Sequence, residues 1–258
     1  MKQFLKKIPC YKQLRAYYSI TKGTYSNKYN FFQKTKFLKI FLSDLNKYKK
    51  DNKNNNFKLS WDFISPYIYD KTENTPVEPT YFYQDTWCAG KVFQNKPNHH
   101  YDIGSKAEMI GIISQFVPTT MIDIRPIELK LENLFFKKGD ILNLPFKDNE
   151  IKSLSSICVI EHIGLGRYGD PIDSFGSEKA IKEIKRVLTE RGNLYISLPI
   201  DSENKIYFNA HRTFTRNYIL ELFKPLQLVE EKYIYKKELL DKYEPEKGFG
   251  TGLFWFRK

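Results

Sequence analysis

Three aspartates stand at the ends of three predicted strands, and their positions suit the binding of a nucleoside. Asp102 closes the first strand, Asp123 the second and Asp140 the third. The carboxyl ends of parallel strands meet at one edge of a sheet, where ligands bind. An acid after the second strand can hold the two hydroxyls of a ribose, and one after the third can accept from an adenine amino group. Gly104 would let the backbone come close to such a ligand.

A second group of polar side chains follows the fourth predicted strand and could act on a substrate. It contains one base, one guanidinium, one phenol and two carboxylates: His162, Arg167, Tyr168, Asp170 and Asp173. Activation of a hydroxyl needs a base that takes the proton, and histidine suits this task near neutral pH. The alternative is that Glu161 and His162 only anchor the loop. His211, with Arg212, is a second pair that can be catalytic or structural.

These side chains require a sheet that presents strand ends along one edge. Hydrophobic patterning predicts strands at 99–104, 119–125, 134–141, 153–163, 193–200, 227–237 and 251–258. It predicts helices at 107–117, 177–188 and 216–226, the second capped by Ser177. Alternating strands and helices predict parallel units, and two late strands without a helix between them predict an antiparallel edge.

The region before residue 99 has a different composition. The apolar residues of 31–45 recur at helical spacing, and the polar stretch at 51–56 predicts a boundary. The aromatic stretch at 61–98 fits no regular pattern and is treated as a linker or lid. The predicted organisation is therefore a basic helical extension at 1–60, an aromatic linker at 61–98 and a Rossmann-like domain at 99–258.

The positive charge of the chain is concentrated at its start. The formal net charge is +12, yet residues 1–60 hold 15 Lys and Arg against two acids, and the remainder holds 27 basic and 28 acidic residues. Three interpretations stay open, in this order: a solvated helical face, attachment to an anionic membrane surface, or binding of an anionic substrate or nucleic acid. Nucleic acid is ranked last because no recognised binding motif accompanies the charge.

The cysteines, the possible metal ligands and the hydropathy of the sequence together indicate a cytoplasmic protein. The three cysteines are far apart and form no CxxC, so neither a zinc site nor a disulfide framework is predicted. Glu161, His162 and Asp170 lack the spacing of a metal site, and no metal is predicted. No apolar run approaches about 20 residues, and a peripheral position on the inner face of the membrane stays compatible with the sequence.

Four segments together resemble the motifs of class I S-adenosylmethionine-dependent methyltransferases: HYDIGS, MIDIRP, GDILNLPFKDNEIKSLSSICVIEHI and EIKRVLTERGNLYISLP. With EHIGLGRYGDPID and FNAHRTF, residues 81–256 are also similar to a bacterial family catalogued as a domain of unknown function, whose members are often encoded among genes for surface polysaccharides. The resemblance implies a mostly parallel seven-stranded sheet with an antiparallel last strand, and S-adenosylmethionine as cofactor.

The resemblance also implies roles for individual residues. Asp102, Gly104 and Ser105 would lie near the methionine part of the cofactor, Asp123 and Ile124 at the ribose, Asp140 and Ile141 at the adenine, and Cys158, Val159 and Glu161 along the strand-four wall. The first motif departs from the family pattern, because Ser105, Lys106 and Ala107 follow Gly104 where a second glycine is usual. A nicotinamide site is disfavoured because GxGxxG is absent.

The predicted function is methyl transfer to an oxygen of a sugar or phosphorylated intermediate of surface polysaccharide synthesis. His162, Arg167, Tyr168, Asp170 and His211 are the predicted catalytic residues. Two alternatives stay open: an inactive binding protein that keeps the fold, favoured by the missing glycine, and a nucleic-acid methyltransferase, suggested by the basic extension. The sequence does not determine the oligomeric state.

Overall fold

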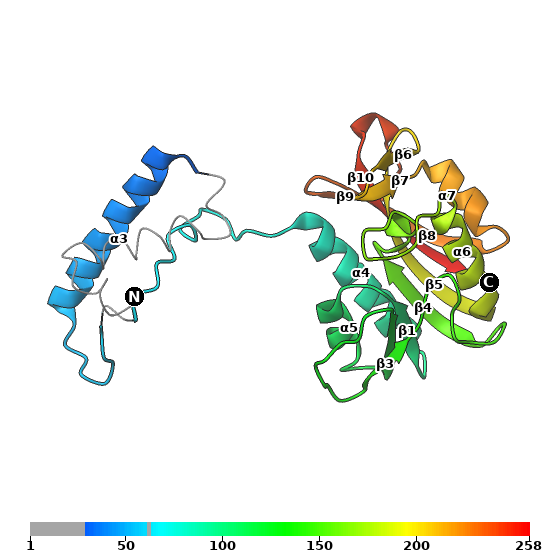
Figure 1. The fold of residues 1–258 in the computed structure, drawn as a ribbon, viewed down its shortest axis with the longest axis horizontal. Coiled ribbons are helices and arrows are strands. Elements are labelled where there is room, and N and C mark those ends of the chain that lie inside the picture. The colour runs from blue at the N-terminus through cyan, green and yellow to red at the C-terminus, as the bar shows by residue number, and fades with distance from the viewer. Residues whose placement is uncertain (1–28, 61–62) are drawn as a thin grey trace. The chain divides into compact units, whose positions relative to one another are not determined.

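The computed structural model describes residues 29–60 and 63–258, and the chain divides into two compact units, Met1–Pro76 and Val77–Lys258 (Figure 1). In the first unit, helix α3 spans Phe31–Asp51. Asn30 accepts from the backbone N–H of Gln33, and the Gln33 side chain accepts from the Asn30 N–H, so the helix begins with a capping box. The predicted helix in the basic extension is confirmed here, and the part of that prediction at 1–28 lies outside the described residues.

The second unit alternates strands and helices through most of its length. Its strands are β1 (His100–Ile103), β2 (Thr119–Asp123), β3 (Leu134–Lys138), β4 (Ile151–Ile157), β5 (Leu188–Ile200), β6 (Lys205–Tyr207), β7 (His211–Thr213), β8 (Gln227–Tyr235), β9 (Glu238–Leu240) and β10 (Gly250–Arg257). Its helices are α4 (Pro79–Asn95), α5 (Ala107–Ile113), η3 (Ile160–His162), α6 (Gly176–Val187), α7 (Arg216–Phe223) and η4 (Pro245–Lys247).

Eight strands form one sheet in the order β3-β2-β1-β4-β5-β10-β8-β9. The first five are parallel, whereas β10 lies between β5 and β8 and runs antiparallel to both. The mostly parallel sheet with an antiparallel last strand is therefore confirmed. The short strand β9 adds an eighth member, antiparallel to β8, and β6 and β7 form a separate pair. The strand order reverses between β1 and β4, the point at which open sheets bind ligands.

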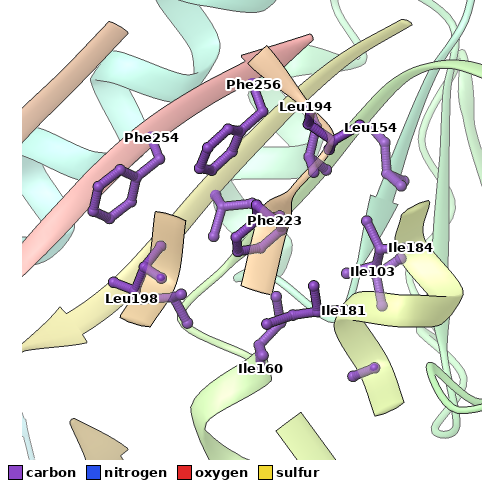
Figure 2. Packing of buried hydrophobic residues seen from close by; sticks show 14 of the residues in the cluster. Ile103, Leu154, Ile160, Ile181, Ile184, Leu194, Leu198, Phe223, Phe254 and Phe256 are labelled. Atoms are coloured by element: carbon purple, nitrogen blue, oxygen red, sulfur yellow. The ribbon is translucent and has the colours of Figure 1, made fainter. Parts of the chain in front are cut away.

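Helices cover both faces of the sheet, and side chains of one strand alternate between the two cores. Leu194, Ile196 and Leu198 of β5 pack with α6 and α7 on one face. Tyr195 belongs to the core beneath α4 and α5 on the other. Figure 2 shows the first core, in which Phe223 of α7 stacks on Phe256 of β10 with ring centroids 4.6 Å apart. This two-sided burial holds the strand ends in place.

The aromatic segment predicted as a linker contains helix α4. Glu78 accepts from the backbone N–H of Tyr81, and Pro79 occupies the first turn, so the helix has a regular start. It buries Gln84, Trp87, Cys88 and Val92, and the last three belong to the core that includes α5 and Tyr195 of β5 in the same unit. The division between the two units after Pro76 thus differs from the predicted boundaries at 60 and 98, because the aromatic run forms a helix with a buried stripe.

One smaller expectation needs correction. Helix α6 begins at Gly176, and the Ser177 hydroxyl donates to the Ile160 carbonyl instead of capping the helix. In the described part of the chain, no helix is both long and apolar enough to cross a membrane.

Candidate functional site

A cavity of about 270 Å³ lies at the carboxyl ends of β1, β2 and β4 and the chain after β3. Ten of its eighteen lining residues were predicted as site residues: Gly104, Asp123, Ile124, Asp140, Ile141, Cys158, Val159, His162, Tyr168 and Asp170. The others are Ile103, Ile122, Arg125, Gly139, Leu142, Ile163, Gly169 and Pro171. Asp102, Ser105, Glu161, Arg167 and His211 are not among the lining residues.

Gly104 and Asp123 face each other across the inner end of the cavity. Gly104 has a φ of +65°, and a Cβ there would lie 3.2 Å from Val159 Cγ1 and 3.8 Å from Asp123 Oδ2. The glycine therefore leaves bare backbone beside the carboxylate. Asp123 Oδ1 accepts from the Arg125 backbone N–H at 2.8 Å, which fixes the side chain, and Oδ2 is turned toward Gly104. This arrangement offers a carboxylate acceptor for a pair of hydroxyls.

Asp140 and Ile141 form another wall. The Asp140 Oδ1 accepts from the Leu142 backbone N–H at 2.9 Å, which closes a tight turn after β3. Ile141 is buried, whereas Ile124 is partly exposed at the cavity. Two isoleucines and a nearby carboxylate suit a flat apolar ring that carries an amino group.

Asp102 and Ser105 form a buried network behind the cavity. Asp102 accepts from the Ser105 backbone N–H and hydroxyl at 3.0 and 2.6 Å, and from the Ser155 hydroxyl of β4. Ser105 Oγ accepts from the Ile157 N–H at 2.9 Å. Burial raises the pKa of Asp102 to about 6 despite these hydrogen bonds. The pair ties β1 to β4 and shapes the turn at Gly104, instead of lining the cavity as predicted.

The loop after β4 is organised around Asp170. Its Oδ2 accepts from the backbone N–H of Gly164 and Gly166 at 2.7 and 3.3 Å, and its Oδ1 from that of Tyr168 at 3.1 Å. Burial alone would raise the pKa of Asp170, but these backbone donors hold it below its ordinary value. The carboxylate predicted as catalytic therefore has a structural task, since its oxygens hold the loop.

His162 lines the cavity, and its hydrogen bonds indicate which ring nitrogen carries the proton. Its Nδ1–H donates to the Ala210 carbonyl at 2.6 Å, because a carbonyl can only accept, and this leaves Nε2 with the lone pair. Burial lowers the pKa of His162 to about 4, so the ring is neutral at neutral pH. Arg167 donates to the same carbonyl at 2.8 Å and lies with its guanidinium 5.1 Å from the Tyr168 ring centroid.

Glu161 is a buried carboxylic acid beside His162. It is 1% exposed, its Oε1 lies 3.5 Å from His162 Nε2, and its Oε2 has no partner in the described part of the chain. Burial raises the pKa of Glu161 to about 8. Glu161 therefore carries its proton at neutral pH and adds no negative charge to the site.

His211 and Arg212 are neighbours in the sequence but lie in different environments. His211 lies between the rings of Tyr207 and Phe249, with centroids 5.1 and 5.7 Å away, and its Nε2 is buried without a partner among the described residues. Burial lowers its pKa. Arg212 is buried and donates to the Ile163 and Asp173 carbonyls at 2.6 and 3.2 Å, so its role is structural.

The structure adds residues that the sequence did not single out. Gln84 of α4 is 1% exposed and accepts from the Cys158 thiol at 3.1 Å and from the Ser197 hydroxyl at 2.9 Å. Arg125 lines the cavity with its guanidinium 4.8 Å from the Tyr168 ring centroid. The one signal for Gln84 was its spacing of four and eight residues from Cys88 and Val92 on one helix face. Within the described residues, no cluster of metal-binding side chains occurs.

Solved structures share this architecture at low sequence identity. A sarcosine dimethylglycine methyltransferase candidate from Galdieria sulphuraria is 17% identical, with a TM-score of 0.52 over 69% of this chain and 86% of its own. The N-methyltransferase NodS from Bradyrhizobium japonicum, solved with S-adenosyl-L-homocysteine, is 14% identical, with a TM-score of 0.50 over 74% and 91%. The [4+2]-cyclase SpnF is 12% identical, with a TM-score of 0.50 over 67% and 81%.

These likenesses show the fold, which is the Rossmann-like methyltransferase fold. The cyclase among them illustrates that the fold by itself does not determine the reaction. A family described as "Caenorhabditis protein of unknown function, DUF268" matches residues 135–238, from β3 to β9. No curated protein matches the chain by sequence.

Proposed function

We propose that this protein transfers a methyl group from S-adenosylmethionine to an oxygen atom of its acceptor. The observation that carries the proposal is the pair formed by Asp123 and Gly104, a carboxylate beside bare backbone, in a cavity where the strand order reverses. NodS, which has this fold, was solved with the demethylated form of that cofactor.

The lining residues fit the parts of the cofactor. Asp123 would accept from the ribose hydroxyls, and Asp140 with Ile141 would hold the adenine. The backbone at Gly104 would lie along the methionine part. When bound, S-adenosylmethionine supplies a methyl group on a positively charged sulfur. Glu161 and His162 are both uncharged at neutral pH. These two side chains would therefore neither neutralise nor strongly repel the positive charge on the cofactor's sulfur.

His162 is the residue best placed to take the acceptor's proton. Its Nδ1–H is held by the Ala210 carbonyl, so the lone pair is on Nε2, 3.5 Å from Glu161 Oε1, and the residue lines the cavity. The low pKa of His162 keeps it unprotonated and ready to accept, although it makes the ring a weak base. Positioning of the acceptor would then supply much of the rate enhancement.

For the acceptor we propose a sugar or phosphorylated intermediate of surface polysaccharide synthesis, which rests on the sequence resemblance. One guanidinium group supports an anionic group on the acceptor, because Arg125 lines the cavity and lies against the Tyr168 ring. Arginine pairs readily with phosphate. Incubation with nucleotide sugars and labelled S-adenosylmethionine would test this: label in a nucleotide sugar supports the assignment, and label only in nucleic acid contradicts it.

Calorimetry with S-adenosylhomocysteine tests the proposed cofactor. We expect binding in the micromolar range, with no heat from NADH as the matched dinucleotide control. Absence of binding at high micromolar concentration would reject the methyltransferase assignment.

An inactive binding protein is the second candidate. Ser105 and Lys106 replace the usual glycine after Gly104, and the Ser105 hydroxyl is committed to Asp102. This candidate keeps the fold without the cofactor, so it predicts no binding of S-adenosylhomocysteine and no label transferred to any acceptor class.

A further inference from the structure

A single row of lysines runs along helix α3. Six positions at spacings of four, three, four, four and three residues place every member of the row on one face of the helix. The row consists of Phe32, Lys36, Lys39, Ser43, Lys47 and Lys50. At a rise of about 1.5 Å per residue, the lysines extend over about 21 Å.

This face is exposed, whereas the opposite face is partly covered. All four lysines of the row are exposed, and Phe32 is 80% exposed. Phe37 on the other side lies 5.1 Å from the Tyr29 ring and 5.6 Å from the Tyr69 ring. The first unit therefore packs against the far side of α3 and leaves the row facing outward.

The row itself carries only positive charge. The two acidic residues of α3, Asp44 and Asp51, lie beside its C-terminal half, three residues before and four residues after Lys47, so the four lysines outnumber two flanking carboxylates. Basic faces of this kind are attracted to anionic lipids, and each lysine near the surface strengthens the attraction.

We propose that the row binds the surface of a membrane that contains anionic lipids. Two features favour lipid over nucleic acid. The row contains lysine alone, a hydrated point charge, and none of the arginine that recognises phosphates and bases through a planar fork. The exposed rings of Phe31 and Phe32 at one end of α3 suit the boundary between headgroups and acyl chains. The proposal does not depend on the proposed function.

Flotation of the full chain with vesicles tests the proposal at physiological salt. The probes are vesicles of pure phosphatidylcholine and vesicles with about one third phosphatidylglycerol. The test variant carries K36Q, K39Q, K47Q and K50Q, which keep helix propensity because Gln and Lys are similar helix formers. The matched control carries K130Q, K152Q, K182Q and K242Q, four exposed lysines of the second unit, and loses the same charge. Circular dichroism checks that both fold.

We expect wild type and control to bind the anionic vesicles alike and the row variant to bind about a hundred- to a thousandfold more weakly. At high salt, where charge is screened, F32S should weaken binding to anionic vesicles more than the replacement of a single lysine of the row does. Equal binding by the two quadruple variants would overturn the proposal. So would equal binding to pure phosphatidylcholine, or row-dependent binding to a DNA duplex without row-dependent binding to vesicles.

Discussion

Replacing Glu161 by Gln should change how the stability of the second unit depends on pH. The Glu161 carboxyl is 1% exposed, and burial raises its pKa to about 8 from the ordinary value of 4.5. Between these two pH values the unfolded chain releases a proton that the folded chain retains. The free energy of unfolding of the wild type therefore falls as pH rises from about 4.5 to 8, relative to a variant without this carboxyl.

The size of the effect follows from the distance between the two pKa values. A separation of about 3.5 pH units corresponds to about 5 kcal/mol, at about 1.4 kcal/mol per unit. Glu161→Gln should thus match the wild type near pH 4.5 and exceed it by up to about 5 kcal/mol above pH 8.

Urea unfolding at a series of pH values, followed by near-ultraviolet circular dichroism, measures this difference. Glu183→Gln is the matched control, because hydrogen bonding to Arg186 lowers the pKa of Glu183. As pH rises through the acidic range, the free energy of unfolding of the wild type should increase relative to that of Glu183→Gln. This change has the opposite sign to the one expected for Glu161→Gln. Parallel stability curves for wild type and Glu161→Gln would refute a buried, protonated Glu161.

Four further outcomes are expected. Asp123→Asn should weaken S-adenosylhomocysteine binding at least about thirtyfold in calorimetry, since hydrogen bonds to a charged carboxylate contribute about 2 kcal/mol each; wild-type affinity would remove Asp123 from the site. Gly104→Ala, at a φ of +65°, should lose about 1–2 kcal/mol of stability in urea and also weaken that binding, and a variant unchanged in both contradicts the close approach. Asp170→Ala should speed tryptic cleavage after Arg167 at least about tenfold, because three backbone donors lose their acceptor, and an unchanged rate means the loop is held otherwise. His162→Ala should bind S-adenosylhomocysteine normally and lose methyl transfer in a labelled-acceptor assay, whereas full transfer would make His162 structural.

The sheet and part of the cavity could be predicted because their signals are local. Each strand-end aspartate stands next to its own apolar run, and the apolar face of α6 repeats within one segment. Knowledge that parallel strand ends share an edge then places Asp123 and Asp140 together. The structure confirms the fold, and both aspartates line one cavity.

The other features of the site could not be predicted, because they depend on hydrogen bonds and packing with residues far away in the sequence. Asp102 and Asp123 look alike in sequence, yet the first is enclosed because Ser155 of β4 donates to it. The Asp170 carboxylate accepts hydrogen bonds from the backbone N–H groups of Gly164 and Gly166. The direction of these N–H groups depends on the loop conformation, in which both glycines have positive φ. Helix α4 was missed because its aromatic residues obscure the buried stripe that Gln84 begins.

The position of β10 also bears on how the chain is made. Residues 250–257 enter the middle of the sheet, between β5 and β8, which precede them in the sequence. During synthesis, β5 and β8 therefore leave the ribosome with edges that have no neighbour, and such edges pair readily with other chains. The second unit can complete its sheet only after translation has passed residue 257, and until then the edges of β5 and β8 are open to such pairing.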